Sequence, residues 1–178
     1  MVTHRHSDHE GGASFLVSHF APQAIHANGP SRALPKSVVA KAGDAWEIDG
    51  VHFRVLNPGN DLERDENERS LVLQVGYGRT EMLLMGDAGT RTESHLSLHD
   101  SYALVKVGHH GAATSSSPRF VAATRPRIAV ISVGTRNRFA HPSADVVKRW
   151  KTAGSAVWRT DRDATLHLAS DGDAITFK

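Results

Sequence analysis

Three histidines and one aspartate lie together in the stretch Val2-Thr3-His4-Arg5-His6-Ser7-Asp8-His9-Glu10-Gly11-Gly12, at the spacing H-x-H-x-D-H. Because His4 and His6 are two residues apart, an extended backbone points both imidazoles to one side. Asp8 falls in phase with them, and His9 follows where the chain can turn into a helix. Imidazole and carboxylate ligands together suit zinc, iron or manganese. The stretch therefore predicts a site for one or two divalent metal ions.

A histidine-rich loop or an expression tag is the alternative interpretation of this stretch. A tag is a bare run of histidines, whereas an aspartate and the pair Gly11-Gly12 are interleaved in this stretch. The interleaving favours a metal site.

Further motifs follow in the remainder of the chain. They are Met85-Gly86-Asp87-Ala88, Val105-Lys106-Val107-Gly108-His109-His110-Gly111 with Ser115-Ser116-Ser117 behind it, Val130-Ile131-Ser132-Val133-Gly134, Asn137-Arg138-Phe139-Ala140-His141-Pro142 and Trp158-Arg159-Thr160-Asp161-Arg162-Asp163. Together with the first stretch, these motifs resemble the metallo-β-lactamase superfamily. Within it, they resemble the hydrolase-like domain of the ComEC family of competence DNA-channel proteins.

The resemblance implies an α/β fold, the metallo-β-lactamase-like αββα sandwich. By length, residues 1–178 form a single domain with a substantial core. Before His4 there is less sequence than a strand of ordinary length, about five to six residues, requires. The resembled family has a segment of strands before this point. We therefore expect a sandwich that is incomplete in its N-terminal half.

Hydrophobic patterning and turn residues place the expected elements. Hairpins are expected around Asp49-Gly50 and around Tyr77-Gly78-Arg79. A capping box, Thr90 to Glu93, predicts a helix as far as about His99. The other expected helices are 12–20, 117–124 and 143–153, and the other expected strands are 24–26, 103–107, 128–133, 156–159, 165–168 and 174–177.

The resemblance also implies a ligand set for two metal ions, zinc or manganese. His4 and His6 would hold one ion, and Asp8 and His9 the second. Asp87 would bridge both ions. His110 would be a further ligand, with His109 as the competing candidate. A histidine that many members of the superfamily carry before the bridging aspartate is missing from residues 67–70, which leaves one ion with fewer nitrogen ligands.

A two-metal site of this kind suits hydrolysis, because paired ions lower the pKa of a water molecule and neutralise charge on a phosphodiester. Asp8 and Asp87 are the candidate catalytic residues, with Asp8 orienting the nucleophile or accepting its proton. The candidate substrate contacts are His109, Ser115, Ser116 and His141. The serines can instead cap a helix, and His141 can instead be a ligand or a helix-entry residue.

Composition restricts the possible functions. The chain has no cysteine, which excludes disulfides and thiol nucleophiles. Its net charge is only +2, so nucleic-acid binding would need a local basic face, for which Arg5, Lys106, Arg119, Arg136 and Arg138 are candidates, with Lys106 expected at a strand edge. Aromatic residues make up 6% of the chain, which argues against a stacking platform for single strands. No apolar run approaches the roughly 18 residues that span a bilayer, so we expect no membrane insertion by this chain.

The leading hypothesis is a metal-dependent phosphodiesterase, since the resembled domain is thought to degrade the non-transported DNA strand during uptake. The resemblance implies single-stranded DNA as the partner, a place within a membrane channel, and the extracytoplasmic face of the inner membrane. Two alternatives remain open. One is a hydrolase of a small ester or lactone with an enclosed apolar pocket, and the other is an inactive metal-binding fragment of a larger channel protein.

Overall fold

The structure, a computed structural model, describes residues 1–59, 65–99 and 101–178. Its centre is one seven-stranded mixed sheet in the order β3-β4-β5-β6-β7-β8-β9. The strands are β3 (Ala45–Ile48), β4 (Val51–Asn57), β5 (Val72–Tyr77), β6 (Thr80–Leu84), β7 (Leu104–Lys106), β8 (Ile128–Ile131) and β9 (Ala156–Arg159).

The sheet has an antiparallel half and a parallel half. Tight turns join β3 to β4 and β5 to β6, the longer segment 58–71 joins β4 to β5, and all four strands pair antiparallel. β6 to β9 are joined by helical crossovers and pair parallel, as strands separated by a dozen or more residues do. The crossover helices are α3 (Thr90–Glu93), α4 (Pro118–Thr124) and α5 (Ala144–Thr152). The expected α/β class, with hairpins first and strand–helix alternation afterwards, is confirmed.

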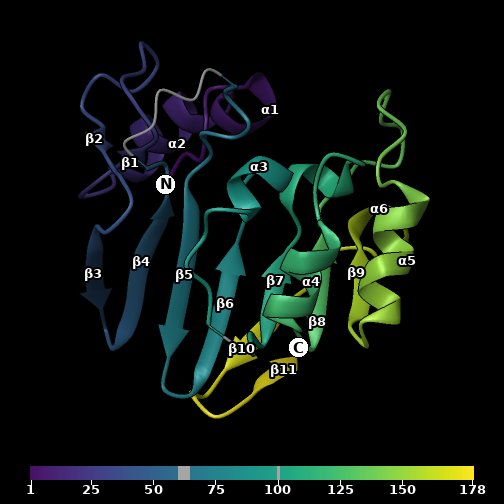
Figure 1. Ribbon diagram of the computed structural model, residues 1–178. Helices are drawn as coiled ribbons and strands as arrows, with labels where there is room; N and C mark the ends of the chain where they lie inside the picture. The colour runs from purple at the N-terminus through teal and green to yellow at the C-terminus, as the bar shows by residue number, and fades with distance from the viewer. Residues whose placement is uncertain (60–64, 100) are drawn as a thin grey trace.

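Alternating side chains give the sheet two apolar faces. On β6, Leu83 belongs to a cluster that includes Phe120 of α4 and Trp150 of α5. Leu84, the next residue, packs against a second cluster built on Val55 and Leu73. Figure 1 shows α4 lying across β7 and β8. The crossover helices thus cover the face of the sheet that carries the first cluster.

The remaining elements lie at the two ends of the large sheet. A short 3-10 helix, η1 (Gly108–Gly111), follows β7, and α6 (Thr160–Asp163) follows β9. The others are α1 (Ser7–Glu10), α2 (Ala13–Phe20), β1 (His26–Ala27), β2 (Val38–Val39), β10 (Leu168–Ser170) and β11 (Ile175–Phe177). Figure 1 shows α1 and α3 beyond the carboxyl end of β6, and the hairpin β10–β11 near its start.

The N-terminal motif is attached to the sheet by backbone hydrogen bonds. Val2 bridges Ala27 in parallel, and its N–H donates to the carbonyl of His26 (2.8 Å). The carbonyl of Thr3 accepts from the N–H of Leu71 (2.9 Å), just before β5. The histidine motif therefore begins where β1 and the start of β5 meet.

The predicted helix at 90–99 is much shorter, and its capping box is wrong. The N-cap is Gly89, and the helix ends at Glu93. Glu68 supplies the cap from a distant segment, because its carboxylate accepts from the N–H groups of Gly89 (3.2 Å) and Thr92 (2.9 Å). The Glu93 carboxylate is directed instead to the backbone N–H groups of Ser116 and Ser117.

Three further expectations differ from the structure or fall outside it. Residues 160–163, for which no element was predicted, form the single turn α6. β10 begins three residues later than predicted, at Leu168. Part of the loop expected at 57–69 lies outside the described residues. In the described ranges, no helix has both the length and the apolar character needed to cross a bilayer.

Candidate metal centre

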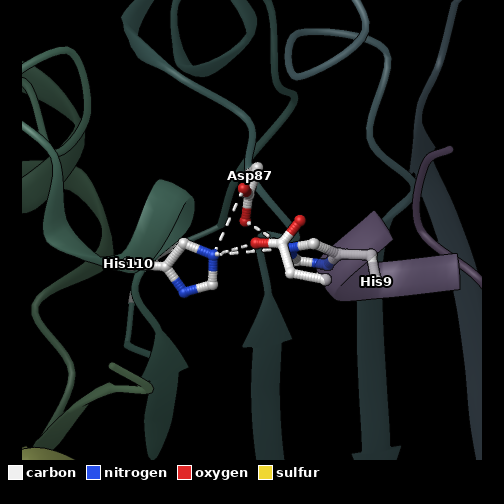
Figure 2. Close-up of side chains that lie close together, drawn as sticks. His9, Asp87 and His110 are labelled. Atoms are coloured by element: carbon white, nitrogen blue, oxygen red, sulfur yellow. Dashed lines mark hydrogen bonds and ion pairs between the residues drawn. The ribbon is translucent and has the colours of Figure 1, made fainter. Parts of the chain in front are cut away.

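The sheet brings three distant segments of the chain to one edge. Asp87 follows β6 and His110 follows β7, so both lie at the carboxyl ends of neighbouring parallel strands, where open α/β sheets place ligand sites. Asp8 and His9 lie on α1, which reaches the same edge from the N-terminus. Figure 2 shows the rings of His9 and His110 approaching Asp87 from opposite sides.

Four of the predicted ligands form a tight cluster. One ligand atom from each of Asp8, His9, Asp87 and His110 lies within 4.8 Å of all the others. The Nε2 of His110 is 3.4 Å from both Asp87 Oδ2 and Asp8 Oδ2. The Nε2 of His9 is 3.2 Å from Asp87 Oδ1 and 3.3 Å from His110 Nε2. Four polar side chains thus converge on one point.

Hydrogen bonds orient the two rings so that Nε2 faces the cluster. His110 Nδ1 donates to the backbone carbonyl of Ser132 (2.8 Å), which leaves the lone pair of the neutral ring on Nε2. His9 Nδ1 contacts the hydroxyl of Thr3 (3.2 Å). Metal-binding histidines commonly have such a partner on the nitrogen that does not bind the ion.

The cluster fits a divalent cation. Asp87 Oδ1 is buried and, among the described residues, has no hydrogen-bond partner. Two neutral imidazole nitrogens that face each other at 3.3 Å repel unless a proton or a cation lies between them. Ligand distances of about 2.0–2.2 Å around a tetrahedral ion place neighbouring donors roughly 3.4 Å apart, close to the observed separations. Two imidazoles and two carboxylates suit zinc or manganese.

The electrostatics of the cluster keep its carboxylate ionised. Burial raises the pKa of Asp87, but the rings of His110 and His9 outweigh burial and hold that pKa below its ordinary value. Interaction with Asp87 in turn raises the pKa of His110. An ionised carboxylate and a neutral imidazole are the forms that bind a metal ion, so ion binding competes with protonation of His110.

His4 and His6 lie beside the cluster as a second group. His4 is wholly buried, and its Nε2 lies 3.1 Å from His6 Nδ1 and 3.8 Å from Asp87 Oδ2. Burial lowers the pKa of His4 to about 4, which keeps its ring neutral and able to bind a metal ion at neutral pH. The structure therefore brings all six predicted ligands together, four of them in the tight cluster and His4 and His6 beside it.

Glycines allow the two strand-end loops to pack closely. Gly86 has φ +56°, and a Cβ there would lie 2.8 Å from the Cβ of Ser70. A Cβ on Gly108 would lie 2.2 Å from the carbonyl oxygen of Ala88. The two histidines of the second loop also adopt left-handed backbone, with φ +49° at His109 and +51° at His110. Positive φ is uncommon outside glycine and is concentrated at functional sites.

His109 lies outside the cluster although it neighbours His110 in sequence. Its Nε2 contacts the side-chain amide of Asn67 (3.4 Å), and its Nδ1 contacts the hydroxyl of Thr114 (3.3 Å). Its ring meets that of His141 edge-on, with centroids 5.6 Å apart. The structure thus places His109 and His141 together, adjacent to the cluster but not in it.

Ser115 and Ser116 do not lie where the predicted contact with a substrate requires them. Both are wholly buried. The Ser115 hydroxyl donates to the carbonyl of Ala112 (3.0 Å), and the Ser116 hydroxyl accepts from the indole of Trp150 (3.0 Å). A hydroxyl engaged inside the core cannot donate to a substrate phosphate, so the structure does not support this role. The alternative, a helix cap, holds for Ser117, whose side chain accepts from the N–H of Phe120.

Two of the residues predicted for a basic face, Arg5 and Lys106, have partners within the chain. Arg5 is paired with Glu66, with Nη2 and Oε2 2.9 Å apart. Lys106 ends β7, a strand in the interior of the sheet, and not a strand at its edge. Its ammonium donates to the carbonyl of Gly86 (3.1 Å), and burial lowers its pKa although Asp87 opposes that shift. Lys106 thus stabilises the loop that carries Asp87 by this hydrogen bond to Gly86.

One supporting residue was missed altogether. Ser70 is buried, its hydroxyl accepts from the N–H of Asp87 (2.9 Å), and it lies 3.3 Å from His4 Nδ1. A single serine 17 residues before Asp87 carries no local signature, so only the three-dimensional contact reveals its role.

A groove of about 420 Å³ opens beside the cluster. Asp8 and His110 form its metal-cluster end. The other lining residues are Ser132, Val133, Gly134, Asn137, Phe139, His141 and Thr160. A substrate can therefore reach the cluster along the loop that follows β8.

Comparison with known proteins is consistent with the metal site that the geometry indicates. A family model described as Metallo-beta-lactamase superfamily matches residues 1–135, which include all six predicted ligands. The fold class predicted from the motifs is consistent with this match.

Relatives extend the similarity over most of the chain. Recombination protein 2 of Haemophilus influenzae is 33% identical over 164 residues, covering 90% of this chain and 21% of the relative. Competence protein ComA of Neisseria gonorrhoeae is 34% identical over 174 residues, covering 94% and 24%. ComE operon protein 3 of Bacillus subtilis is 27% identical over 201 residues, covering 99% and 25%. The chain therefore spans about a quarter of the length of these relatives, and the predicted resemblance to competence proteins is confirmed.

Proposed function

This chain belongs to the metallo-β-lactamase superfamily. From that premise we propose that it is a metal-dependent phosphodiesterase whose substrate is single-stranded DNA. The observation that carries the proposal is the convergence of Asp8, His9, Asp87 and His110 at the end of an open groove. Names that refer to competence and recombination, borne by proteins similar to nearly the whole chain, support DNA as the substrate.

Each ligand has a role in the proposal. Asp8, His9 and His110 would hold one divalent ion, and His4 and His6 would hold a second. Asp87 would be a ligand shared by both. When bound, such ions lower the pKa of water and neutralise charge on a phosphodiester.

The chain's own residues provide the remaining steps. The side chain of Asp8 is 60% exposed, so its carboxylate can accept a proton from the attacking water at the mouth of the groove. Ser132 and Thr3 hold the imidazoles of His110 and His9 in place through their Nδ1 atoms. The groove next to Asp8 and His110 admits the substrate and is open to solvent along its length.

The biological setting is part of the same proposal. The chain would act in DNA uptake, as a domain of a longer competence protein. An ester or lactone hydrolase calls for an enclosed apolar pocket, whereas the groove at the cluster is partly open. A partly open groove can admit an extended DNA strand.

The test measures metal content and cleavage together. The purified chain, its Asp87→Ala variant and an Asp173→Ala control are loaded with zinc or manganese, analysed by elemental mass spectrometry and incubated with single-stranded DNA. Asp173 is the control because its exposed carboxylate pairs with Arg79 and it is neither a predicted ligand nor a groove-lining residue. We expect about two ions per chain and metal-dependent cleavage for the parent and the control, and the loss of both in Asp87→Ala.

Other outcomes identify the alternatives. Cleavage retained by Asp87→Ala would refute the two-metal assignment. Hydrolysis of a nitrophenyl ester or a lactone without DNA cleavage would favour the small-ester enzyme. Bound metal without any hydrolysis would favour a metal-binding domain of a larger protein.

A further inference from the structure

The loop after β8 places an exposed aromatic ring next to the metal cluster. Phe139 is 63% exposed and lines the groove whose other end is formed by Asp8 and His110. Burying a large aromatic side chain is favourable, so a phenylalanine that is left open beside a site of catalysis is suited to contact a ligand. The low aromatic content of the chain does not conflict with this, since one well-placed ring is enough.

The ring belongs to a small aromatic wall. Phe139 and His141 stack with centroids 5.8 Å apart and planes inclined by 18°. Both rings line the groove. The guanidinium of Arg138 lies 5.0 Å from the Phe139 centroid, and the Phe139 side chain nevertheless remains 63% exposed.

Hydrogen bonds hold the wall in place. The Asn137 side chain accepts from the N–H of His141 (2.8 Å) and donates to the carbonyls of His141 (2.8 Å) and Gly134 (3.0 Å). At the start of the loop, Thr160 exchanges hydrogen bonds with the backbone N–H (2.8 Å) and carbonyl (2.9 Å) of Val133. A braced loop loses little conformational freedom when a ligand binds against it.

We propose that Phe139, with His141 behind it, stacks against a nucleobase of the DNA strand whose phosphate lies at the metal cluster. This inference rests on the proposed function and adds to it the part of the substrate that the groove recognises. Base–aromatic stacking tolerates every base, so the site selects single-stranded nucleic acid over other phosphodiesters without reading sequence. Arg138 lies where a neighbouring phosphate can meet a positive charge.

The test separates base recognition from phosphate recognition. Fluorescence anisotropy measures binding of a thymidine 12-mer and of an abasic 12-mer with the same backbone charge to the metal-loaded chain at low salt, both oligomers having phosphorothioate linkages that resist cleavage. We expect the parent chain to bind the thymidine oligomer about tenfold more tightly than the abasic one. Phe139→Leu should remove most of this difference, and Phe139→Trp should retain it.

Phe20→Leu is the matched control, because Phe20 is 68% exposed on α2 and does not line the groove. It should keep the full preference. Equal binding of the two oligomers by the parent, binding of neither, or an unchanged preference in Phe139→Leu would each overturn the nucleobase site.

A second measurement distinguishes this inference from the proposed function. Rates are compared for thymidine 5′-(4-nitrophenyl) phosphate and methyl 4-nitrophenyl phosphate, which share a leaving group and differ in the nucleoside. Phe139→Leu should raise the KM of the thymidine substrate about tenfold and leave the methyl substrate unchanged. No hydrolysis of either substrate, together with a base preference that Phe139→Leu abolishes, would refute the phosphodiesterase and support the nucleobase site.

Discussion

His109 and His110 are adjacent and share nearly the same left-handed backbone conformation, yet their side chains contact different residues. Only the His110 ring has one nitrogen held by a carbonyl, that of Ser132, and the other directed at Asp8 and Asp87. His109 has Asn67 and Thr114 as partners. At the scale of single residues, the contacts on the two ring nitrogens separate a proposed ligand from its neighbour.

Replacing the two histidines should therefore have unequal effects. Loss of an outer partner of a metal ligand typically lowers metal affinity roughly 10–100-fold, and loss of the ligand itself should exceed that. His110→Ala should exceed this range and His109→Ala should stay within or below it, as measured by competition with a chromogenic chelator. An equal or reversed order would assign the ligand role to His109.

The sequence identifies the candidate metal ligands, but not the groups that hydrogen-bond to them and hold them in place. The spacing of His4, His6, Asp8 and His9 is local, so it can be recognised in one stretch. Ser70 and the Ser132 carbonyl act across distances in the chain, and the latter is a backbone group that any residue could supply. Such contacts are set by tertiary packing and have no local pattern.

At the scale of elements, the metal motif depends on a clamp between two loops. The Arg5 guanidinium donates to both carboxylate oxygens of Glu66, at 3.0 and 2.9 Å, and the Arg5 backbone N–H donates as well (3.1 Å). Asn28 adds a donor from the loop after β1 (3.1 Å). The clamp fixes the segment between His4 and α1.

This clamp should be visible in the pH dependence of stability. The hydrogen bonds from Arg5 lower the pKa of Glu66 from its ordinary value of 4.5 to about 2, although burial opposes them. Because the folded-state pKa lies below the unfolded one, the stabilisation is present above about pH 4.5 and is lost as the pH falls toward 2. Glu66→Gln should lower the free energy of unfolding at pH 7 by about 1–2 kcal/mol, a modest amount because Arg5 is 44% exposed.

Urea unfolding between pH 7 and pH 2.5 measures the effect. The parent should lose stability more steeply below pH 4.5 than Glu66→Gln does. Glu47→Gln serves as the control, since Glu47 is 55% exposed and pairs with His52 on the far hairpin. Parallel pH curves for the parent and Glu66→Gln would contradict the role of the clamp.

Elements were predictable where their signals are local. Asp49-Gly50 marks the turn between β3 and β4, and Ser117-Pro118 marks the start of α4. The Thr90–Glu93 capping box was wrong because two partners distant in sequence compete for its groups: Glu68 caps the helix, and Glu93 binds the backbone of Ser116 and Ser117. A local motif holds only when no tertiary partner is better placed.

At the scale of the whole molecule, the proposed ion would connect three parts of the chain that are distant in sequence. Its donors lie on α1, on the loop after β6 and on η1. Metal removal should therefore destabilise the whole fold. At an ion concentration one hundred times its Kd, binding contributes about 2.7 kcal/mol, which for a chain of this size corresponds to a fall in Tm of about 5–10 °C on chelation.

Differential scanning fluorimetry with and without EDTA tests this expectation. Asp87→Ala should show no shift on chelation, because its cluster has lost its central carboxylate. A Tm shift that is the same in the parent and in Asp87→Ala would place the ion somewhere other than this cluster.

The order of strands and helices was predictable, whereas their assembly into one sheet was not. Alternating hydrophobic segments identify β7, β8 and β9 singly. Their joining to the antiparallel hairpins through β6 depends on which side chains pack on each face, as Leu83 and Leu84 illustrate. Pairing across that junction is a property of the packed core.

The distance along the chain between His9 and His110 is 101 residues, and the carbonyl that holds His110 lies another 22 residues further on. During synthesis, the ribosome releases the H-x-H-x-D-H motif first and its remaining donors much later. A nascent chain therefore offers only a partial, low-affinity set of donors until β8 has emerged and joined the sheet. Binding of the proposed ion would therefore follow the folding of this domain through β8, and free metal in the cell would act on the folded domain and not on its unfinished N-terminal part.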